Sequence, residues 1–291
     1  MKLITSVPLV ATHAVSPDHS RQCSWELAIA AVFQDEARWL AEWLEYHLLV
    51  GVQHFYLYNN FSTDNYLDVL QPYIERGDVE LIEWPYVGGE TYDAVQCAAY
   101  RDALSRAHNR VKWLAIIDLD EFLVPVKDDD LTSVFRRLES DTAVGGVCVA
   151  WMYFGTSNVA KIPIDRLMIE TLVSSGSVLE THEPFPWDQG TFKSIVRPLY
   201  TESFESPHVA IYESGHYHVP LFHDLIQINH YWTKDEVFFN EVKVPRNARR
   251  GVPVETSSEW ATTMNKETRL RAPIMRFVPS LKKRMGLYKE E

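Results

Sequence analysis

Lys112-Trp113-Leu114-Ala115-Ile116-Ile117-Asp118-Leu119-Asp120-Glu121-Phe122 is the stretch that decides the fold. The apolar run from Trp113 to Ile117 predicts a buried strand, and it ends in two carboxylates one residue apart, Asp118 and Asp120. Side chains two apart on an extended chain point the same way, and open α/β sheets bind ligands at the carboxyl ends of their strands. Hard cations such as Mg²⁺ and Mn²⁺ take carboxylate oxygens together with substrate phosphates. The stretch therefore predicts a metal ion that bridges the protein and a diphosphate.

Strand-like and helix-like segments alternate on both sides of this stretch. Apolar runs predict strands at residues 25–33, 54–58, 79–84, 111–117 and 144–150. Helical spacing of apolar residues predicts helices at 35–48, 66–76, 91–108 and 131–139, with Asp64 as the cap of the second and Asp130 as the cap of the fourth. This alternation is typical of an α/β fold with a mostly parallel sheet flanked by helices. After Trp151 the segments become shorter and richer in Pro, Gly and His, which predicts a more irregular, β-rich C-terminal half.

Composition and charge exclude several classes of protein. Of the 291 residues, 46% are hydrophobic and 23% charged, so a sizeable core is expected and global disorder is not. The net charge of −12 is concentrated before residue 241, and such an acidic body argues against nucleic acid as the main partner. The basic tail after it, with Lys282, Lys283 and Arg284 beside apolar residues, suits either an anionic membrane surface or an ordinary solvated helix.

Cysteine usage bears on the compartment. Cys23, Cys97 and Cys148 are odd in number and widely separated, which indicates neither a disulfide framework nor a zinc site. A reducing cytoplasm is therefore expected. No apolar run approaches the roughly 20 residues that cross a bilayer, and residues 1–22 are expected to be a lead-in and not a signal peptide.

Four polar residues could bind the donor. Asp35 and Glu36 follow the first strand, where a carboxylate either accepts hydrogen bonds from a base or ribose or caps the next helix. Lys193 and Arg197 share one face of a later strand, where they either bind phosphate or a substrate carboxylate or are simply solvated.

The second half adds a histidine cluster and a loop. A zinc site is one interpretation of the cluster, but buried or hydrogen-bonded histidines are favoured for all members except His230. His230 suits a late metal ligand, and Lys234 could neutralise phosphate. The loop 181–190 is rich in aromatic residues and Pro and carries Glu183 and Asp188, which suits a sugar acceptor. The cluster consists of His208, His216, His218, His223 and His230.

Several segments together carry a resemblance to a known family. They are 33–36, 40–47, 51–60, 62–64, 117–125, 151–155, 193–198 and 229–231. In this order they resemble glycosyltransferase family 92 and its bacterial relatives among the family-2-like glycosyltransferases, over roughly residues 25–250. The more specific parts are Asp118-Leu119-Asp120-Glu121-Phe122 and Glu42-Trp43-Leu44-Glu45-Tyr46-His47.

The resemblance implies a GT-A fold and a nucleotide-diphosphate sugar donor, typically a UDP-sugar and often galactose. It also implies Mn²⁺ (or Mg²⁺) held at Asp118 and Asp120, His230 as a late metal ligand, and transfer with inversion at the anomeric carbon. Family 92 usually has Asn-Glu at the position of Asp35-Glu36, and a Lys-Ser pair where Lys234 is followed by Asp235. Its later Lys and Arg-Gly pattern survives only at Lys243 and Arg250-Gly251. The expected divisions are a lead-in (1–24), a nucleotide-sugar-binding half (25–150), an acceptor-side half of the same domain (151–250) and a basic tail (251–291).

The expected reaction is an inverting sugar transfer to a glycan or glycolipid acceptor. A carboxylate of the second half would take the acceptor's proton, with Asp188 as first and Glu183 as second candidate. A nucleotidyltransferase of similar fold is one rival, but its early glycine-rich, basic phosphate loop is missing near residues 33–36. A non-catalytic carbohydrate-binding protein is another, and it would have lost the paired acids. A metal-dependent hydrolase built on the histidines is a third. The expected location is the cytoplasm, with peripheral contact at the inner membrane face through the basic tail.

Overall fold

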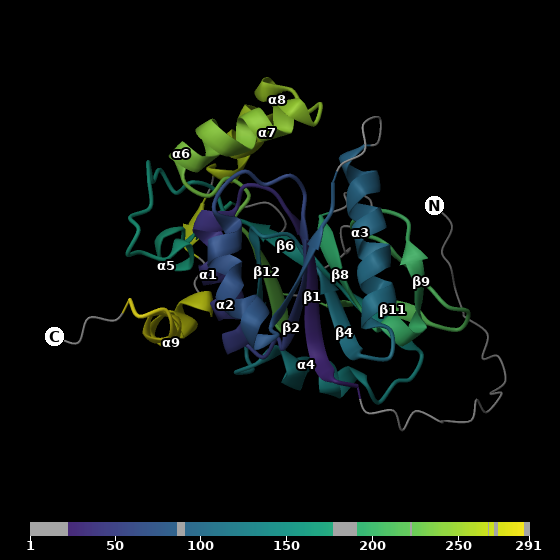
Figure 1. Ribbon diagram of the computed structural model, residues 1–291. Coiled ribbons are helices and arrows are strands. Elements are labelled where there is room, and N and C mark those ends of the chain that lie inside the picture. Colours follow the sequence, from purple (N-terminus) through teal and green to yellow (C-terminus); the bar gives the residue numbers. More distant parts are fainter. Residues whose placement is uncertain are drawn as a thin grey trace, which may run out of the picture.

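The computed structural model describes residues 23–85, 91–176, 191–221, 223–266, 268–270 and 273–287. These residues form a central sheet of nine strands in the order β3-β2-β1-β4-β8-β6-β12-β5, with β11 paired to β6 (Figure 1). The strands of this sheet are β1 (Trp25–Phe33), β2 (His54–Asn59), β3 (Val79–Glu83), β4 (Val111–Ile116), β5 (Glu121–Pro125), β6 (Val144–Tyr153), β8 (Phe192–Val196), β11 (Tyr217–Leu221) and β12 (Ile226–His230). Short strands outside it are β7 (Ser174–Ser175), β9 (Thr201–Phe204), β10 (Ala210–Tyr212) and β13 (Arg269–Leu270).

The first four strands of the sheet, β3-β2-β1-β4, are all parallel, as the alternation of strands and helices predicted. β8 then runs antiparallel to both β4 and β6, and β12 runs parallel to β6 but antiparallel to β5. Strands from the two halves of the chain thus alternate within one sheet. The predicted α/β fold with a more irregular second half is confirmed.

Helices cover both faces of the sheet. On β1, Leu27, Ile29 and Phe33 pack in the cluster that includes α1, α2, α4 and α9, whereas Ala28 and Ala30 pack with α3 and the β9–β10 hairpin. Burial on both faces explains why β1 and β4 read as continuous apolar runs and not as alternating ones. The helices are α1 (Ala37–Leu49), α2 (Tyr66–Arg76), α3 (Tyr92–Ala107), α4 (Leu131–Leu138), α5 (Met168–Thr171), α6 (Glu236–Phe238), α7 (Val244–Arg249), α8 (Val254–Met264) and α9 (Val278–Arg284). Short 3₁₀ segments are η2 (Pro198–Tyr200) and η4 (Pro273–Phe277), and η3 (Phe239–Lys243) is π-helical.

Helix ends follow the capping residues of the sequence with one exception. Asp130 accepts a hydrogen bond from the Ser133 N–H and caps α4 as predicted. The cap predicted for α2 at Asp64 is wrong, because α2 begins after Asn65 and the Asp64 carboxylate accepts from the Ala37 N–H instead. Asp64 therefore caps α1, whose first residue, Ala37, precedes it by 27 residues in the sequence.

The described part of the C-terminal tail packs against the core. Phe277 and Leu281 are buried, while Lys282 pairs with Glu170 at 3.0 Å and Arg284 with Glu45 at 2.8 Å. A helix that binds a membrane surface needs its apolar face free for the lipid. The predicted membrane contact therefore finds no support in residues 273–287, which fit the alternative of an ordinary surface helix. Within the described ranges, no helix is both long and apolar enough to cross a bilayer.

His47 connects α1 to β5 and makes the fold sensitive to acid. Its Nδ1–H donates to the Trp43 carbonyl at 2.8 Å, and its Nε2 accepts from the Leu123 N–H at 3.2 Å. Burial lowers the pKa of His47 to about 3, so between pH 6.5 and 3 only the unfolded chain takes up this proton. We expect this residue to lower the free energy of unfolding by about 1.4 kcal/mol per pH unit below pH 6. Urea unfolding at pH 7, 6 and 5 gives the free energy of unfolding at each pH. This free energy should fall less steeply with decreasing pH in His47→Gln than in the parent. An equal fall in both proteins would show that His47 is not the residue responsible.

Candidate active site

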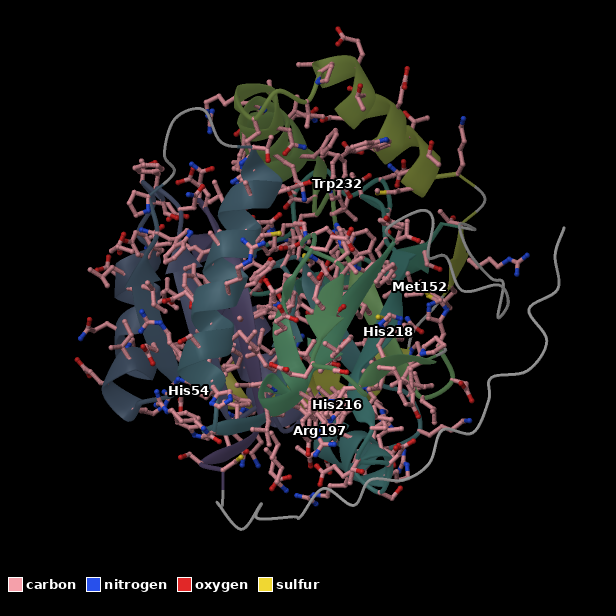
Figure 2. All side chains as sticks on the ribbon, turned by 90° about the vertical axis from the view of Figure 1, so that its right-hand side faces the viewer. His54, Met152, Arg197, His216, His218 and Trp232 are labelled. Atoms are coloured by element: carbon pink, nitrogen blue, oxygen red, sulfur yellow. The ribbon has the colours of Figure 1, made fainter. Side chains whose placement is uncertain are left out.

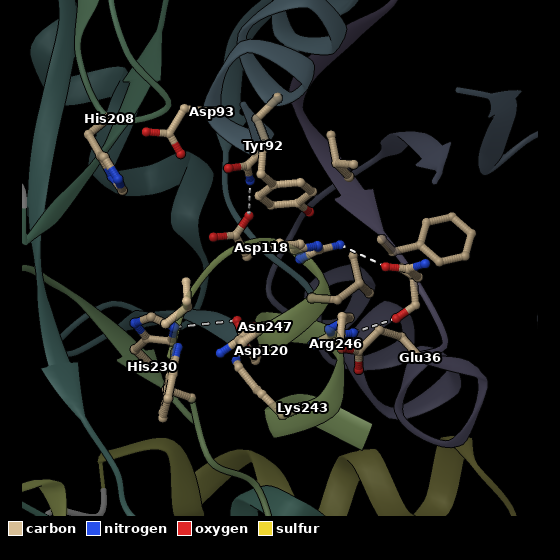
Figure 3. Close-up of a pocket in the computed structure, with 18 of the residues that line it drawn as sticks. Glu36, Tyr92, Asp93, Asp118, Asp120, His208, His230, Lys243, Arg246 and Asn247 are labelled. Carbon is tan, nitrogen blue, oxygen red and sulfur yellow. Dashed lines mark hydrogen bonds and ion pairs between the residues drawn. The ribbon is translucent and has the colours of Figure 1, made fainter. Parts of the chain in front are cut away.

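A cavity of about 460 Å³ opens at the carboxyl ends of β1 and β4 (Figure 3). Figure 1 shows α6, α7 and α8 above this end of the sheet and α4 below the opposite end. The position is the one that an open α/β sheet normally offers to a ligand. Its lining residues come from both halves of the chain: Val32, Phe33, Gln34, Glu36, Thr91, Tyr92, Asp93, Gln96, Asp118, Leu119, Asp120, Trp151, Lys193, His208, His230, Trp232, Lys243, Arg246, Asn247, Arg250, Val252 and Trp260.

Asp118 and Asp120 both line the cavity, but not for the reason that the sequence suggested. They lie in a turn between β4 and β5, which the Glu121 N–H closes by donating to the Asp118 carbonyl at 3.0 Å. The alternation expected of an extended chain does not apply to this turn. Glu121 also holds it from its side chain, whose Oε2 accepts from the Asp118 N–H at 2.9 Å.

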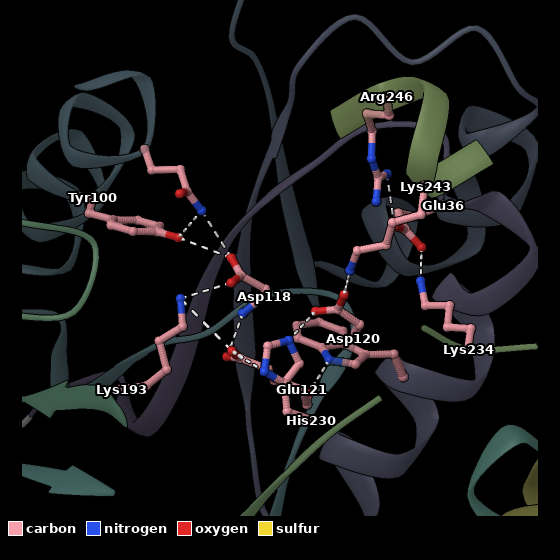
Figure 4. A network of polar contacts seen from close by, with 12 residues as sticks. Glu36, Tyr100, Asp118, Asp120, Glu121, Lys193, His230, Lys234, Lys243 and Arg246 are labelled. Carbon is pink, nitrogen blue, oxygen red and sulfur yellow. Dashed lines mark hydrogen bonds and ion pairs between the residues drawn. The ribbon is translucent and has the colours of Figure 1, made fainter. Parts of the chain in front are cut away.

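Asp118 is held by residues of α3 and β8 (Figure 4). Lys193 Nζ donates to its Oδ2 at 2.8 Å, and Gln96 Nε2 donates to its Oδ1 at 3.0 Å. Burial opposes ionisation of this carboxyl, but the Lys193 ammonium outweighs it and keeps the pKa of Asp118 below its usual value. Asp118 is thus an ionised acid with both oxygens engaged by protein donors.

Asp120 faces different partners. Its Oδ2 pairs with the Lys243 ammonium, and its Oδ1 lies 3.4 Å from His230 Nε2 (Figure 4). Burial opposes ionisation here too, but Lys243 and His230 together hold the pKa of Asp120 well below its usual range. Burial lowers the pKa of His230, so the imidazole is neutral at pH 7 and can act as a ligand.

Glu121 stands behind these residues as a fully buried carboxyl. Its Oε1 lies 3.9 Å from Lys193 Nζ and 3.8 Å from His230 Nδ1. Oε1 and His230 Nδ1 have no hydrogen-bond partner within the described part of the chain. Burial raises the pKa of Glu121 well above its usual value. Glu121 therefore lies next to both Lys193 and His230, which line the cavity, without lining it itself.

The residues present fit a divalent ion in part. Neighbouring ligands of Mg²⁺ at 2.1 Å are about 3 Å apart, close to the 3.4 Å between Asp120 Oδ1 and His230 Nε2. No group of three or more His, Cys, Asp or Glu suited to a metal occurs among the described residues. Both oxygens of Asp118 already accept from Lys193 and Gln96, whereas Asp120 has only Oδ2 paired with a lysine, so Asp120 and His230 are the better placed pair. The protein would thus supply two ligands, and phosphates and water the remainder, as is usual for Mg²⁺ sites.

A helical segment lies over the cavity and supplies most of its positive charge. α6, η3 and α7 follow one another, and Pro245 near the start of α7 lacks the N–H that a regular helix would use. The intervening π-helical turn, in which the Val244 N–H donates to the Phe239 carbonyl, places Lys243 over Asp120. Such turns occur often at functional sites. Arg250, just after α7, lies 3.5 Å over the Tyr92 ring and donates to the Gln34 side chain at 3.0 Å.

Lys243, Arg246 and Arg250 were not predicted as site residues from the sequence. The only signal was the remnant of the family's Lys and Arg-Gly pattern at Lys243 and Arg250-Gly251. Arg246 gave no signal of its own, because it follows a proline in a segment without clear helical spacing.

Glu36 and Lys234 form a buried cluster with Arg246 beside the cavity. The Glu36 carboxylate pairs with the Lys234 ammonium through one oxygen and with Arg246 Nη1 at 3.0 Å through the other. Lys234 is completely buried and is not among the lining residues, so its predicted contact with phosphate is not supported. Asp35 also lies outside the lining, because its Oδ1 accepts from the Thr63 N–H at 2.7 Å in a turn with φ of 53°.

Arg197 is not among the residues that line the cavity, so its predicted contact with the donor is not supported. Its guanidinium stacks 4.4 Å over the Tyr200 ring, and Figure 2 shows it near His216, far from Trp232 at the cavity end. His216 stacks on Tyr200 at 4.2 Å, which fits the interpretation favoured for most histidines of the cluster. His208 is an exception in position, since it lines the cavity. Glu183 and Asp188 lie outside the described residues.

Comparison of the sequence with known families gives one match over most of the chain. The model of glycosyltransferase family 92 matches residues 26–273. A family 92 protein of Oryza sativa subsp. japonica is 28% identical over 88% of this chain and 40% of its own length. One of Arabidopsis thaliana is 26% identical over 71% of this chain and 35% of its own length. The chain thus spans about two fifths of the length of these relatives.

Solved structures show weaker likenesses, which concern the fold alone. The mannosyltransferase PcManGT from Pyrobaculum calidifontis, in complex with GDP-Man and Mn²⁺, is 15% identical with a TM-score of 0.42, over 94% of this chain and 72% of that one. TarS 1–349 of S. aureus, in complex with UDP, is 9% identical with a TM-score of 0.36, over 67% of this chain and 60% of that one.

Proposed function

Because the chain belongs to glycosyltransferase family 92, we propose that it transfers a sugar from a nucleotide-diphosphate donor to a glycan or glycolipid hydroxyl. The resemblance seen in the sequence is thereby confirmed, and the α/β sheet agrees with the GT-A fold that the resemblance implies. One observation carries the proposal: acids and cations suited to a metal-bound diphosphate share a single cavity at the carboxyl ends of β1 and β4.

We assign the diphosphate to the side of the cavity formed by Asp120, His230 and α7. Asp120 and His230 would hold Mn²⁺ (or Mg²⁺), which when bound neutralises the charge that grows on the departing diphosphate. Lys243, Arg246 and Arg250 line the same side and supply fixed positive charge to the phosphates. Asp118, held in place by Lys193 and Gln96, is left for the ribose hydroxyls. A UDP-sugar, UDP-galactose among them, is the donor that the family favours.

In the proposed step the acceptor oxygen forms a bond to the anomeric carbon. The bond from that carbon to the diphosphate oxygen breaks, and its electron pair leaves with the nucleoside diphosphate. The acceptor's proton passes to a carboxylate, for which Asp188 is the first candidate and Glu183 the second. In-line attack inverts the anomeric carbon.

The compartment and the other partners remain proposals on separate grounds. The unpaired cysteines, Cys23, Cys97 and Cys148, support a reducing location such as the cytoplasm. The net charge of −12 argues against a nucleic-acid partner. The ion pairs of α9 leave a membrane contact without support.

We expect a nucleotide sugar to raise the melting temperature of the protein, and to do so more strongly with Mn²⁺ than with EDTA. A panel of UDP- and GDP-sugars separates the donors. For a donor that is turned over, ¹H NMR of the first product formed should show the anomeric configuration opposite to that of the donor. If no nucleotide sugar binds with or without metal, the transferase is ruled out, whereas release of pyrophosphate from a nucleoside triphosphate would favour a nucleotidyltransferase.

A further inference from the structure

A second cavity of about 390 Å³ adjoins the first and differs from it in character. The two share Trp151, His230, Trp232 and Trp260, so they meet beside the proposed metal ligand. The walls that belong to the second cavity alone are Tyr153, Thr191, Thr263 and Met264. No acidic or basic side chain other than His230 is among its described walls, in contrast to the charged first cavity.

Aromatic rings form most of this second cavity. The Trp232 and Trp260 rings lie 5.5 Å apart at 72°, and the Trp151 and Tyr153 rings lie 5.6 Å apart at 66°. Trp260, on α8, is 47% exposed. The exposed ring of Trp260 continues the wall formed by Trp232, so the aromatic surface reaches the mouth of the cavity. Aromatic walls with a few polar atoms are typical of sites for small organic molecules.

Polar side chains interrupt the aromatic walls of the second cavity. The Thr263 hydroxyl and the His230 imidazole belong to side chains that line it beside the rings. Walls of rings with a few polar groups suit a sugar, which combines an apolar C–H face with hydroxyl groups. A purely apolar occupant, such as a lipid chain, would cover these polar side chains without hydrogen-bonding to them, which is unfavourable.

We propose that this second cavity seats the sugar ring of the acceptor, with its apolar C–H face against Trp232 and Trp260. The inference rests on the proposed function and extends it from the donor to the acceptor. A ring held there presents a hydroxyl toward His230, where the two cavities meet. The oxygen of that hydroxyl forms the new bond to the donor's anomeric carbon as the diphosphate leaves, and its proton goes to the base. The protein therefore recognises the acceptor through its sugar ring and not through a lipid portion.

The test compares binding of methyl glycosides with binding of the donor nucleotide. Methyl glycosides of common hexoses, including galactose, glucose, mannose and fucose, are titrated by saturation-transfer NMR into protein saturated with UDP or GDP and Mn²⁺. At least one should bind, and Trp260→Ala should weaken it about tenfold, with partial recovery in Trp260→Phe. Tyr153→Leu, which changes a wall of the second cavity alone, should weaken the glycoside more than the nucleotide. Tyr217→Ala, which removes a ring that is also 47% exposed but lies outside both cavities, is the matched control.

Failure of this inference differs from failure of the proposed function. If nucleotide sugars bind but glycosides bind equally well to the parent and to Trp260→Ala, the acceptor ring lies elsewhere. If octanol binds in a Trp260-dependent way and no methyl glycoside does, the cavity takes a lipid chain and the inference is overturned. If no nucleotide sugar binds to any form of the protein, the proposed function itself fails.

Discussion

Asp120→Asn is expected to lower kcat for sugar transfer by about 10²–10³-fold, a loss usual for removal of one charge-stabilising group from an active site. The substitution keeps the size of the side chain but removes the charge that would hold a divalent ion next to His230. It also removes the partner of the buried Lys243 ammonium. Stabilisation of the protein by a nucleotide sugar should become nearly independent of Mn²⁺. Steady-state kinetics and melting curves with Mn²⁺ or EDTA measure both effects.

The same substitution at Asp128 provides the control. Asp128 pairs with Arg137 at 2.7 Å on the surface, so Asp128→Asn removes an acid from an ion pair far from the chemistry and should leave kcat unchanged. A double variant, Asp120→Asn with Lys243→Met, distinguishes metal loss from an unpaired lysine. If the double variant regains activity with Mn²⁺ dependence, Asp120 serves to hold Lys243 and the metal lies elsewhere. Full activity of Asp120→Asn itself would remove this residue from the site.

Most helices and strands in the first half of the chain were predicted from local sequence patterns. Elements that depend on pairing with distant residues were missed. The strand β1 and the helix α2 have the predicted bounds, because a buried run and an amphipathic pattern ended by Gly77 are properties of neighbouring residues. β5 was not predicted, because Glu121–Pro125 becomes a strand by pairing with β12 about 100 residues later. Pairing of that kind leaves no periodic signal in a five-residue segment.

The site shows the same division between local and distant information. A buried strand ending in Asp118 and Asp120 was enough to locate the cavity, since strand ends of a parallel sheet meet at one edge. Lys193 lies near the start of β8, but Arg197 follows its last residue, Val196, and four residues of extended chain span about 13 Å. Only the residue at the start of β8 reaches the cavity, and the direction of β8 was not readable from the sequence. Lys243 reaches it through a π-helical turn that apolar spacing cannot reveal.

Glu36→Gln is expected to lower the free energy of unfolding by about 3–5 kcal/mol, the usual cost of leaving a buried charge without its partner. The Glu36 carboxylate lies between Lys234, which is fully buried, and Arg246, which is 5% exposed. A neutral amide in its place leaves two buried cations facing each other. Urea unfolding measures the loss, and Glu80→Gln, in an ion pair with Arg106 whose side chains are about one-third exposed, should lose no more than about 1 kcal/mol.

The outcome also tests whether Glu36 binds the donor, which was one of the two interpretations from the sequence. The other, a helix cap, is not supported, because the Glu36 side chain makes no cap hydrogen bond to α1. A carboxylate that mainly binds the donor base would, when neutralised, raise the KM for the nucleotide sugar and change stability little. If the carboxylate mainly holds α7 over the cavity, Glu36→Gln lowers the free energy of unfolding. Adding Lys234→Met, which removes one of the two unpaired charges, should then restore part of it. Both oxygens of Glu36 are engaged by Lys234 and Arg246, which leaves few lone pairs for a ligand and favours the second outcome. Retained stability together with a raised KM would assign Glu36 to the donor and leave Arg246 held only by its other contacts.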